Sequence, residues 1–315
     1  MQIYFVDVEG GQATLFVTPA GQSLLVDTGW AGFDGRDAKR IAAAAKAAGV
    51  KKIDYVVITH YHRDHVGGAP QLEKRIKVGT FVDHGPNLEN SDVTRTDYAA
   101  YEKVLAHAKH LVVKPGDTIP IEGLDVRVLT AVGEHVATAV AGAGEENSLC
   151  ADEPEAAEDD SENARSLGLL VRYGSFRVLD LGDLTKKKEL ELVCPKNLIG
   201  GVDLFVVSHH GLAQSNARAL VHAVHPRVAV MDNGARKGGS PEAWQTVHDS
   251  PGLEDLWQLH YSVEGGAQHN VEESFIANPE EGDKDRGYWI KVAAEWDASF
   301  TVVNARNGSA KTYRK

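Results

Sequence analysis

Residues 58–68 read Ile58-Thr59-His60-Tyr61-His62-Arg63-Asp64-His65-Val66-Gly67-Gly68, and they follow an apolar run that is typical of a buried strand. Three imidazoles and one carboxylate lie within six residues of this stretch. Charged histidines would repel one another there, and neutral ones would bury unpaired nitrogens, so the crowding calls for a bound cation. The stretch therefore predicts a metal site at the end of a strand.

The spacing divides these donors between two ions. In an extended turn His60 and His62 project to the same side and can bind one divalent ion, whereas Asp64 and His65 follow a bend and can reach a second. The glycine pair that follows is expected to let the backbone turn sharply into a supporting helix. A histidine-rich surface loop without metal is the alternative, which such a dense set of donors directly after a strand disfavours.

The stretch resembles the metal-binding signature of the metallo-β-lactamase superfamily, and residues 5–13 and 24–29 look like the first strands of that fold. More narrowly, the chain is similar to the soluble hydrolase domain of bacterial competence-type DNA-uptake proteins and its free-standing relatives, from residue 2 to about residue 235. The resemblance implies an α+β fold, a four-layer αβ/βα sandwich. Two mixed sheets would lie face to face with helices outside, and the metal ligands would come from loops at one rim.

The resemblance also implies ligands later in the chain. Asp183, behind a glycine at a strand tip, matches an aspartate that bridges two ions in the family. The next apolar run ends in a histidine pair, where the family pattern favours His209 as a ligand and leaves His210 for substrate or proton transfer, although the two can be exchanged. Asp27, at the end of the third expected strand, either holds a ligand imidazole from behind or caps a turn.

One ligand of the first ion is left open. His135 has the right place in the chain order, whereas the competence-type relatives have an asparagine ahead of a serine and a strand, which Asn163 matches. The position can also lack a protein ligand. An asparagine oxygen is a weaker ligand than an imidazole, and it would shift the preference from zinc toward manganese. His84, after another strand, either faces substrate or belongs to a capped turn. The expected cofactors are two divalent ions, zinc ahead of manganese.

Composition sets broader limits. The chain has 315 residues, 43% of them apolar, and is expected to form a single domain. Residues 145–162 are dense in Asp, Glu and Ala, so they are predicted to form a mobile acidic excursion, and the C-terminal quarter is expected to complete the second half of the sandwich. A formal net charge of −12 disfavours stable binding of nucleic acid, and no apolar run is long enough to span a membrane. Cys150 and Cys194 leave a single disulfide open.

Two bound ions lower the pKa of a bridging water toward neutrality, which makes hydroxide available as a nucleophile. In this scheme Asp64 accepts a hydrogen bond from the attacking water, and His210 assists the departing group. The resemblance favours a small or nucleotide-like phosphodiester or other phosphoester as substrate. A β-lactam or lactone hydrolase, and a degenerate binding module without catalysis, are the alternatives. Oligomeric state and compartment stay open, the latter being the cytoplasm or, after removal of a leader, an exported location.

Overall fold

Two β-sheets lie face to face in the computed structural model, which describes residues 1–282 and 285–315. The first sheet has the strand order β18-β17-β16-β1-β2-β3-β4-β5-β6, so it contains both ends of the chain. The bounds of its strands are β1 Gln2–Phe5, β2 Thr14–Val17, β3 Ser23–Val26, β4 Lys52–Val57, β5 Lys77–Asp83, β6 Lys109–Val112, β16 Ile290–Ala294, β17 Phe300–Asn304 and β18 Ala310–Tyr313.

The second sheet has the order β15-β14-β13-β12-β11-β10-β8-β7, with β9 paired to β8. Both sheets are mixed: β3 to β6 and β11 to β15 run parallel, and the other pairs are antiparallel. The bounds of its strands are β7 Thr118–Ile119, β8 Asp125–Ala131, β9 Glu134–His135, β10 Gly168–Tyr173, β11 Phe176–Asp180, β12 Leu204–Val206, β13 Val228–Met231, β14 Asp255–His260 and β15 Ile276–Asn278.

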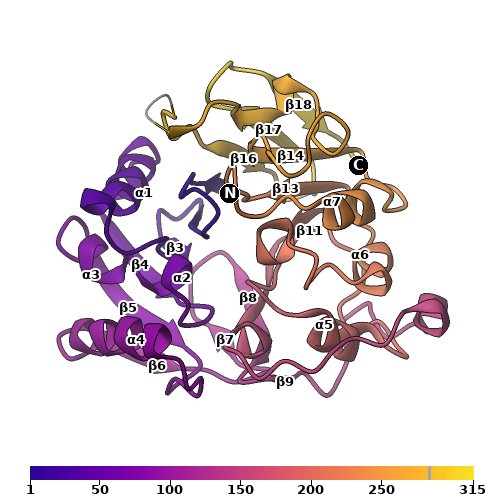
Figure 1. The fold of residues 1–315 in the computed structure, drawn as a ribbon, viewed down its shortest axis with the longest axis horizontal. Helices are drawn as coiled ribbons and strands as arrows, with labels where there is room; N and C mark the ends of the chain where they lie inside the picture. The colour runs from indigo at the N-terminus through magenta and orange to yellow at the C-terminus, as the bar shows by residue number, and fades with distance from the viewer. Residues whose placement is uncertain (283–284) are drawn as a thin grey trace.

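Helices cover the outer face of each sheet (Figure 1). Four follow strands of the first sheet: α1 Arg36–Ala47, α2 Arg63–Val66, α3 Ala69–Leu72 and α4 Asp92–Leu105. Three follow strands of the second: α5 Lys186–Val193, α6 Arg218–Val224 and α7 Pro241–His248. Short 3-10 helices lie at η1 Phe33–Gly35, η2 Ser148–Asp152, η3 Asn163–Arg165, η4 Ser208–Gly211 and η5 Glu273–Phe275.

Three apolar clusters explain the layers. The central cluster joins side chains from both sheets, such as Phe5 and Phe16 of the first and Trp257 of the second. Outer clusters pack α1 onto the first sheet through Ile41 and α6 onto the second through Leu220. Burial of these faces is the main favourable contribution to folding.

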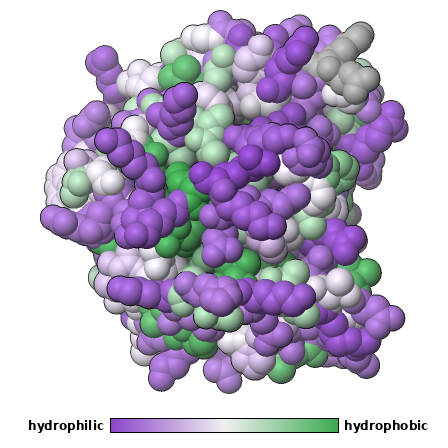
Figure 2. Space-filling view, turned by 90° about the vertical axis from the view of Figure 1, so that its left-hand side faces the viewer, coloured by the Kyte–Doolittle hydropathy of each residue, from purple (hydrophilic) through white to green (hydrophobic). Residues whose placement is uncertain are grey.

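Figure 2 shows the face with α1, α3 and α4 as largely hydrophilic, broken by small apolar areas. The predicted four-layer αβ/βα sandwich is confirmed.

The C-terminal quarter extends the second sheet, as expected, and also adds strands to the first, which the expectation did not include. β14 and β15 extend the second sheet, but β16 pairs with β1 and brings β17 and β18 into the first. β16 alternates buried and half-buried residues, a pattern that identifies a strand without identifying its partner. Within the described residues, no helix combines the length and apolar character that crossing a membrane requires.

Candidate metal centre

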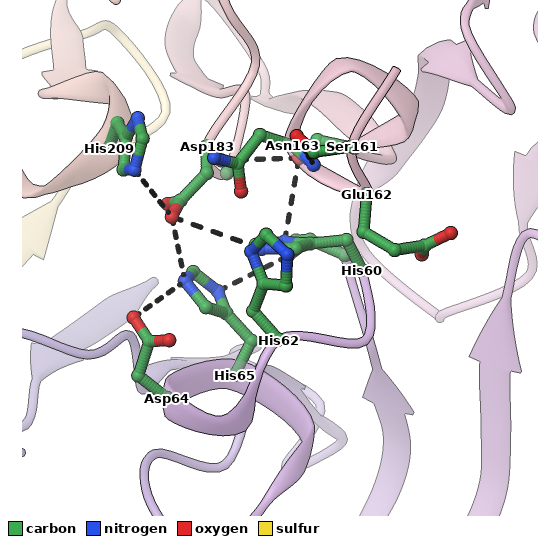
Figure 3. A network of polar contacts seen from close by, with 12 residues as sticks. His60, His62, Asp64, His65, Ser161, Glu162, Asn163, Asp183 and His209 are labelled. Carbon is green, nitrogen blue, oxygen red and sulfur yellow. Dashed lines mark hydrogen bonds and ion pairs between the residues drawn. The ribbon is translucent and has the colours of Figure 1, made fainter. Parts of the chain in front are cut away.

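The predicted donors converge at one rim of the sandwich, from loops of both sheets (Figure 3). The histidine stretch, residues 60–65, follows β4 of the first sheet. Asp183 follows β11, and the pair His209 and His210 follows β12, in the second sheet. Segments far apart in sequence thus meet where parallel strands end, which is the usual place for a site in sheets of this kind.

The carboxylate of Asp183 lies at the centre of the cluster. Its Oδ2 is 3.1 Å from Nε2 of His65 and 3.3 Å from Nε2 of His209. Its Oδ1 is 3.3 Å from Nε2 of His210. Oδ2 of Asp64 is 3.3 Å from Nε2 of His65 and 3.2 Å from Nε2 of His210. Asp64, His65, Asp183 and His210 are all buried, and their donor atoms lie within 4.8 Å of one another, so this quartet can hold one ion.

His60 and His62 lie on the other side of Asp183. Nε2 of His60 is buried, has no hydrogen-bond partner among the described residues, and lies 3.8 Å from Oδ2 of Asp183. The His62 ring lies 4.7 Å from the His60 ring, centroid to centroid, and its Nε2 is 2.9 Å from a carboxylate oxygen of Glu89. Oδ1 of Asn163 is also buried and lacks a hydrogen-bond partner in the part of the chain that the structure describes, and Figure 3 draws Asn163 beside the cluster. Unpartnered buried donors of this kind fit a second cation.

Fixed partners hold the rear nitrogens of His60 and His65 in the first sheet's half of the site. Nδ1 of His65 is 2.7 Å from Oδ2 of Asp27, and the hydroxyl of Thr59 donates to the same oxygen at 2.6 Å. That hydroxyl also lies 3.1 Å from Nδ1 of His60. Partners behind a ligand imidazole set its tautomer and orientation. The Nε2 atoms of His60 and His65 are therefore the ones presented to the cluster.

The second sheet's half is built in the same way. Nδ1 of His209 lies 3.2 Å from the hydroxyl of Ser215. Nδ1 of His210 lies 3.3 Å from Oδ1 of Asp232, an ion-pair contact that lacks hydrogen-bond geometry. Both histidines have a left-handed backbone, with φ of 55° each. Residues other than glycine rarely adopt this backbone conformation, and strained backbone of this kind is common at functional sites.

The charges in the cluster oppose one another strongly. Burial alone would raise the pKa of Asp64, but Lys237 and His65 outweigh it and hold that pKa well below its usual range. Burial likewise would raise the pKa of Asp183, and His209 and His65 keep it well below. Burial and the neighbouring rings lower the pKa of His60 well below its usual value. The carboxylates are thus ionised and His60 is neutral, the forms that bind metal. Against the effect of burial, neighbouring carboxylates raise the pKa of His65 well above its usual value and that of His210 to about 10, so a bound ion would displace a proton from each of these rings.

A sequence model of the metallo-beta-lactamase superfamily matches residues 6–145. The chain belongs to the metallo-beta-lactamase superfamily. This superfamily member is distantly related to competence proteins. It is 27% identical to ComE operon protein 3 of Bacillus subtilis over 60% of the chain, and 26% identical to recombination protein 2 of Haemophilus influenzae over 84%. The chain spans only 21% and 28% of the length of these two relatives.

Among solved structures, the superfamily member is similar to the metallo-beta-lactamase fold protein YhfI from Bacillus subtilis. The TM-score is 0.47 at 12% identity, and the match covers 82% of this chain and 95% of that one.

Two residues suggested by the sequence of this metallo-beta-lactamase superfamily protein lie outside the cluster. His135 lies on β9, where its Nδ1 is 3.5 Å from a carboxylate oxygen of Glu191 and 34% of its side chain is exposed. His84 is buried, with Nε2 3.0 Å from Oε2 of Glu162. Between the two residues suggested for the open ligand position of the first ion, the structure thus brings Asn163 to the cluster and leaves His135 apart.

Sequence reasoning missed several contacts of the centre in this superfamily member. The ammonium of Lys237 contacts the carboxylate of Asp64 and donates to the carbonyl oxygen of Gly10 at 2.8 Å. The only sequence signal for it is a lysine within a glycine-rich stretch, residues 234–239, after an apolar run. No sequence pattern marked Glu89, Asp232 or Ser215. Each of them contacts a single histidine of the site, and no local spacing predicts such a contact.

Proposed function

We propose that the protein is a metal-dependent hydrolase with a dinuclear centre. The observation that carries this proposal is a buried quartet, Asp64, His65, Asp183 and His210, whose donor atoms lie within 4.8 Å of one another, with His60 and His209 beside Asp183. When bound there, two divalent ions would supply hydroxide near neutral pH and polarise an oxygen of the substrate. Zinc suits the imidazole-rich set, and the amide oxygen of Asn163 leaves manganese as the alternative.

The donors divide around Asp183 in this proposal. His60, His62 and Asn163 would hold the first ion, and Asp64, His65 and His210 the second, with Asp183 shared. The sequence favoured His209 as the ligand, but the compact quartet contains His210, so we propose the exchange. His209 lies nearer the surface, lines the adjoining cavity and would face substrate.

The chain's own groups prepare the reaction. Asp64 stays ionised beside Lys237 and can accept a hydrogen bond from an attacking water. Burial lowers the pKa of His209 to about 4, so this ring is neutral near pH 7, and its Nε2–H, next to the cavity, can donate a hydrogen bond to the oxygen of a departing group. The competence and recombination relatives favour a phosphodiester or other phosphoester as the substrate class, and the net charge of −12 favours a small substrate over a long nucleic acid.

A panel of three chromogenic substrates tests this function. The full chain, loaded with zinc or with manganese, is assayed on bis-p-nitrophenyl phosphate, a chromogenic cephalosporin and a simple lactone. We expect turnover of the phosphodiester, and Asp183→Ala should abolish it together with stoichiometric metal binding. Asp125→Ala, at an exposed ion pair on β8, is the matched control and should keep both.

The other outcomes discriminate between the alternatives. Turnover of the cephalosporin or lactone alone would replace the phosphoester assignment. Activity that survives in Asp183→Ala would contradict the dinuclear scheme. Near-zero metal content that added zinc or manganese does not restore would instead favour a binding module without catalysis.

A further inference from the structure

A cavity of about 620 Å³ opens beside the metal centre. One wall is the acidic strap, which we define as residues 153–159, and the opposite wall includes Asn163, Thr185 and His209. Because Nε2 of His209 is 3.3 Å from Asp183, the cavity leads directly to the proposed reaction centre. A substrate that lies in this cavity therefore lies against the strap.

The strap gives this cavity a negative wall. Glu158 and Glu242 each pair with a lysine, at 3.1 Å and 2.6 Å. Glu153 and Asp159 accept hydrogen bonds only from uncharged groups, and Glu155 has neither a hydrogen bond nor an ion pair in the described part of the chain. Three lining carboxylates thus form no direct ion pair within the described residues, although Lys187 attracts Glu155 and Lys186 also lines the cavity.

The rest of the lining points to a bound molecule. Within the described residues, the hydroxyl of Thr185, a residue only 6% exposed that lines the cavity, is buried without a hydrogen-bond partner. Pro154, Ala156 and Ala157 add small apolar surface between the carboxylates. A wall of carboxylates and small apolar groups suits an ammonium group with methyl or methylene substituents, and it repels a second anionic group.

Both ends of the strap are anchored. Before it, Cys150 forms a disulfide with Cys194 at the end of α5. After it, the side chain of Glu162 is fully buried, with Oε2 3.0 Å from Nε2 of His84 and its Oε1 accepting from the backbone N–H of Leu88. These anchors hold the carboxylates over the cavity, so their charge is positioned before a substrate arrives.

We propose that this cavity selects small esters, phosphodiesters foremost, that carry a positively charged amine or quaternary ammonium group. The ester would lie at the metal centre and the cation against the strap. The inference rests on the proposed function for its reaction, and it adds the substrate class. It also explains how a centre with two cations can discriminate against polyanions, which the strap repels.

A pair of substrates with the same shape and different charge tests the proposal. p-Nitrophenyl phosphorylcholine and p-nitrophenyl 3,3-dimethylbutyl phosphate differ in a quaternary nitrogen that replaces a carbon. In both, water attacks phosphorus, the P–O bond to the aryl group breaks, and p-nitrophenolate leaves. We expect kcat/KM of the metal-loaded enzyme to be about tenfold higher for the choline ester, and the ratio to shrink in 1 M salt (a chosen condition of roughly 3 Å screening length).

Charge-neutral variants locate the effect. Glu155→Gln and Asp159→Asn should each lower the ratio about threefold, the scale expected for one partly screened charge. Glu102→Gln, on the exposed side of α4 away from the cavity, is the matched control and should leave the ratio unchanged. Equal rates on the two esters, or a ratio indifferent to both strap variants, would overturn the proposal.

A binding measurement separates this inference from the proposed function. Choline and 3,3-dimethylbutanol are titrated into the metal-free protein and followed by NMR. We expect only choline to bind, and more weakly to Glu155→Gln. Choline binding without hydrolysis of any ester would support the cavity's preference while the hydrolase assignment fails. Hydrolysis without any preference for choline would overturn the inference and leave the hydrolase intact.

Discussion

Asp27 shows how a single side chain organises the site. Its two oxygens accept from the backbone N–H of Thr59 at 2.8 Å and from the Thr59 hydroxyl, and one of them also holds Nδ1 of His65. The resemblance suggested this aspartate, because it ends a strand next to the histidine stretch. Glu89 and Lys237, which act on His62 and Asp64, were not predictable, since nothing local in sequence marks a partner that folding brings from 27 or 173 positions away.

Replacing Asp27 with asparagine should weaken metal binding while preserving the fold. Asp27 has a φ of 61°, a left-handed conformation that asparagine also tolerates. The change removes the charge behind His65, and losses of such partners typically cost about 10- to 100-fold in metal affinity. Competition titration against a chromogenic chelator measures the affinity. Asp125→Asn serves as the control, and an unchanged affinity in Asp27→Asn would mean that the contact with His65 does not support the centre.

At the scale of elements, local patterns predicted which strands end in metal-binding residues. They did not predict which residues are required by close packing against another segment. The sequence suggested that Gly67 and Gly68 turn the backbone sharply, yet Gly67 has a φ of −61° and Gly68 a φ of −75°, both ordinary helical values. Their real constraint is space: a Cβ on Gly68 would lie 2.0 Å from the carbonyl oxygen of Thr28. Such a contact depends on another segment, so the sequence pattern alone could not reveal it.

Helix α5 buries a carboxyl group whose titration should affect stability. Burial raises the pKa of Glu189 to about 7, and the group accepts from the backbone N–H of Ala217 at 2.7 Å. The native state therefore keeps this proton up to about pH 7, whereas the unfolded chain releases it near its ordinary value. The free energy of unfolding should fall as pH rises through this window, by about 3 kcal/mol from this group.

Glu189→Gln should remove that part of the pH dependence, because an amide keeps an acceptor oxygen for Ala217 and does not titrate. Urea denaturation at pH 5, 6, 7 and 8 (about the window that the shift defines) measures it. Glu191→Gln, on a partly exposed side of the same helix, is the control. The assignment would be contradicted if the free energy of unfolding changed with pH in the same way for the wild type and for Glu189→Gln.

The disulfide between Cys150 and Cys194 should stabilise the protein through the loop it closes. The two cysteines are 44 positions apart, and closing a loop of this length typically adds about 2–4 kcal/mol by restricting the unfolded chain. The double variant Cys150→Ala/Cys194→Ala should lose this amount in urea denaturation without a change of metal affinity. Reducing agent should shift the wild type toward the double variant and leave the double variant unaffected. A loss of metal affinity would instead show that the bridge reaches the centre.

For the molecule as a whole, the metal centre joins the two sheets at one rim. His60, His62, Asp64 and His65 come from the first sheet, while Asp183, His209 and His210 come from the second. Ions bound between them would contact both halves, so unfolding either half would lose the free energy of metal binding. Metal loading should therefore stabilise both sheets together, which also tests the prediction that the chain is a single domain.

We expect zinc or manganese at about a thousand times its dissociation constant to raise the free energy of unfolding by about 4 kcal/mol, or the melting temperature by roughly 5–10 °C. Calorimetry of the full chain, with metal and with chelator, measures the shift in melting temperature and the number of unfolding transitions. One transition should move as a unit, because the donors of each ion come from both sheets or share Asp183. Asp183→Asn keeps the size of the side chain and should lose most of the shift. Two separate transitions, of which metal moves only one, would show that the halves unfold independently and that the ions belong to one of them.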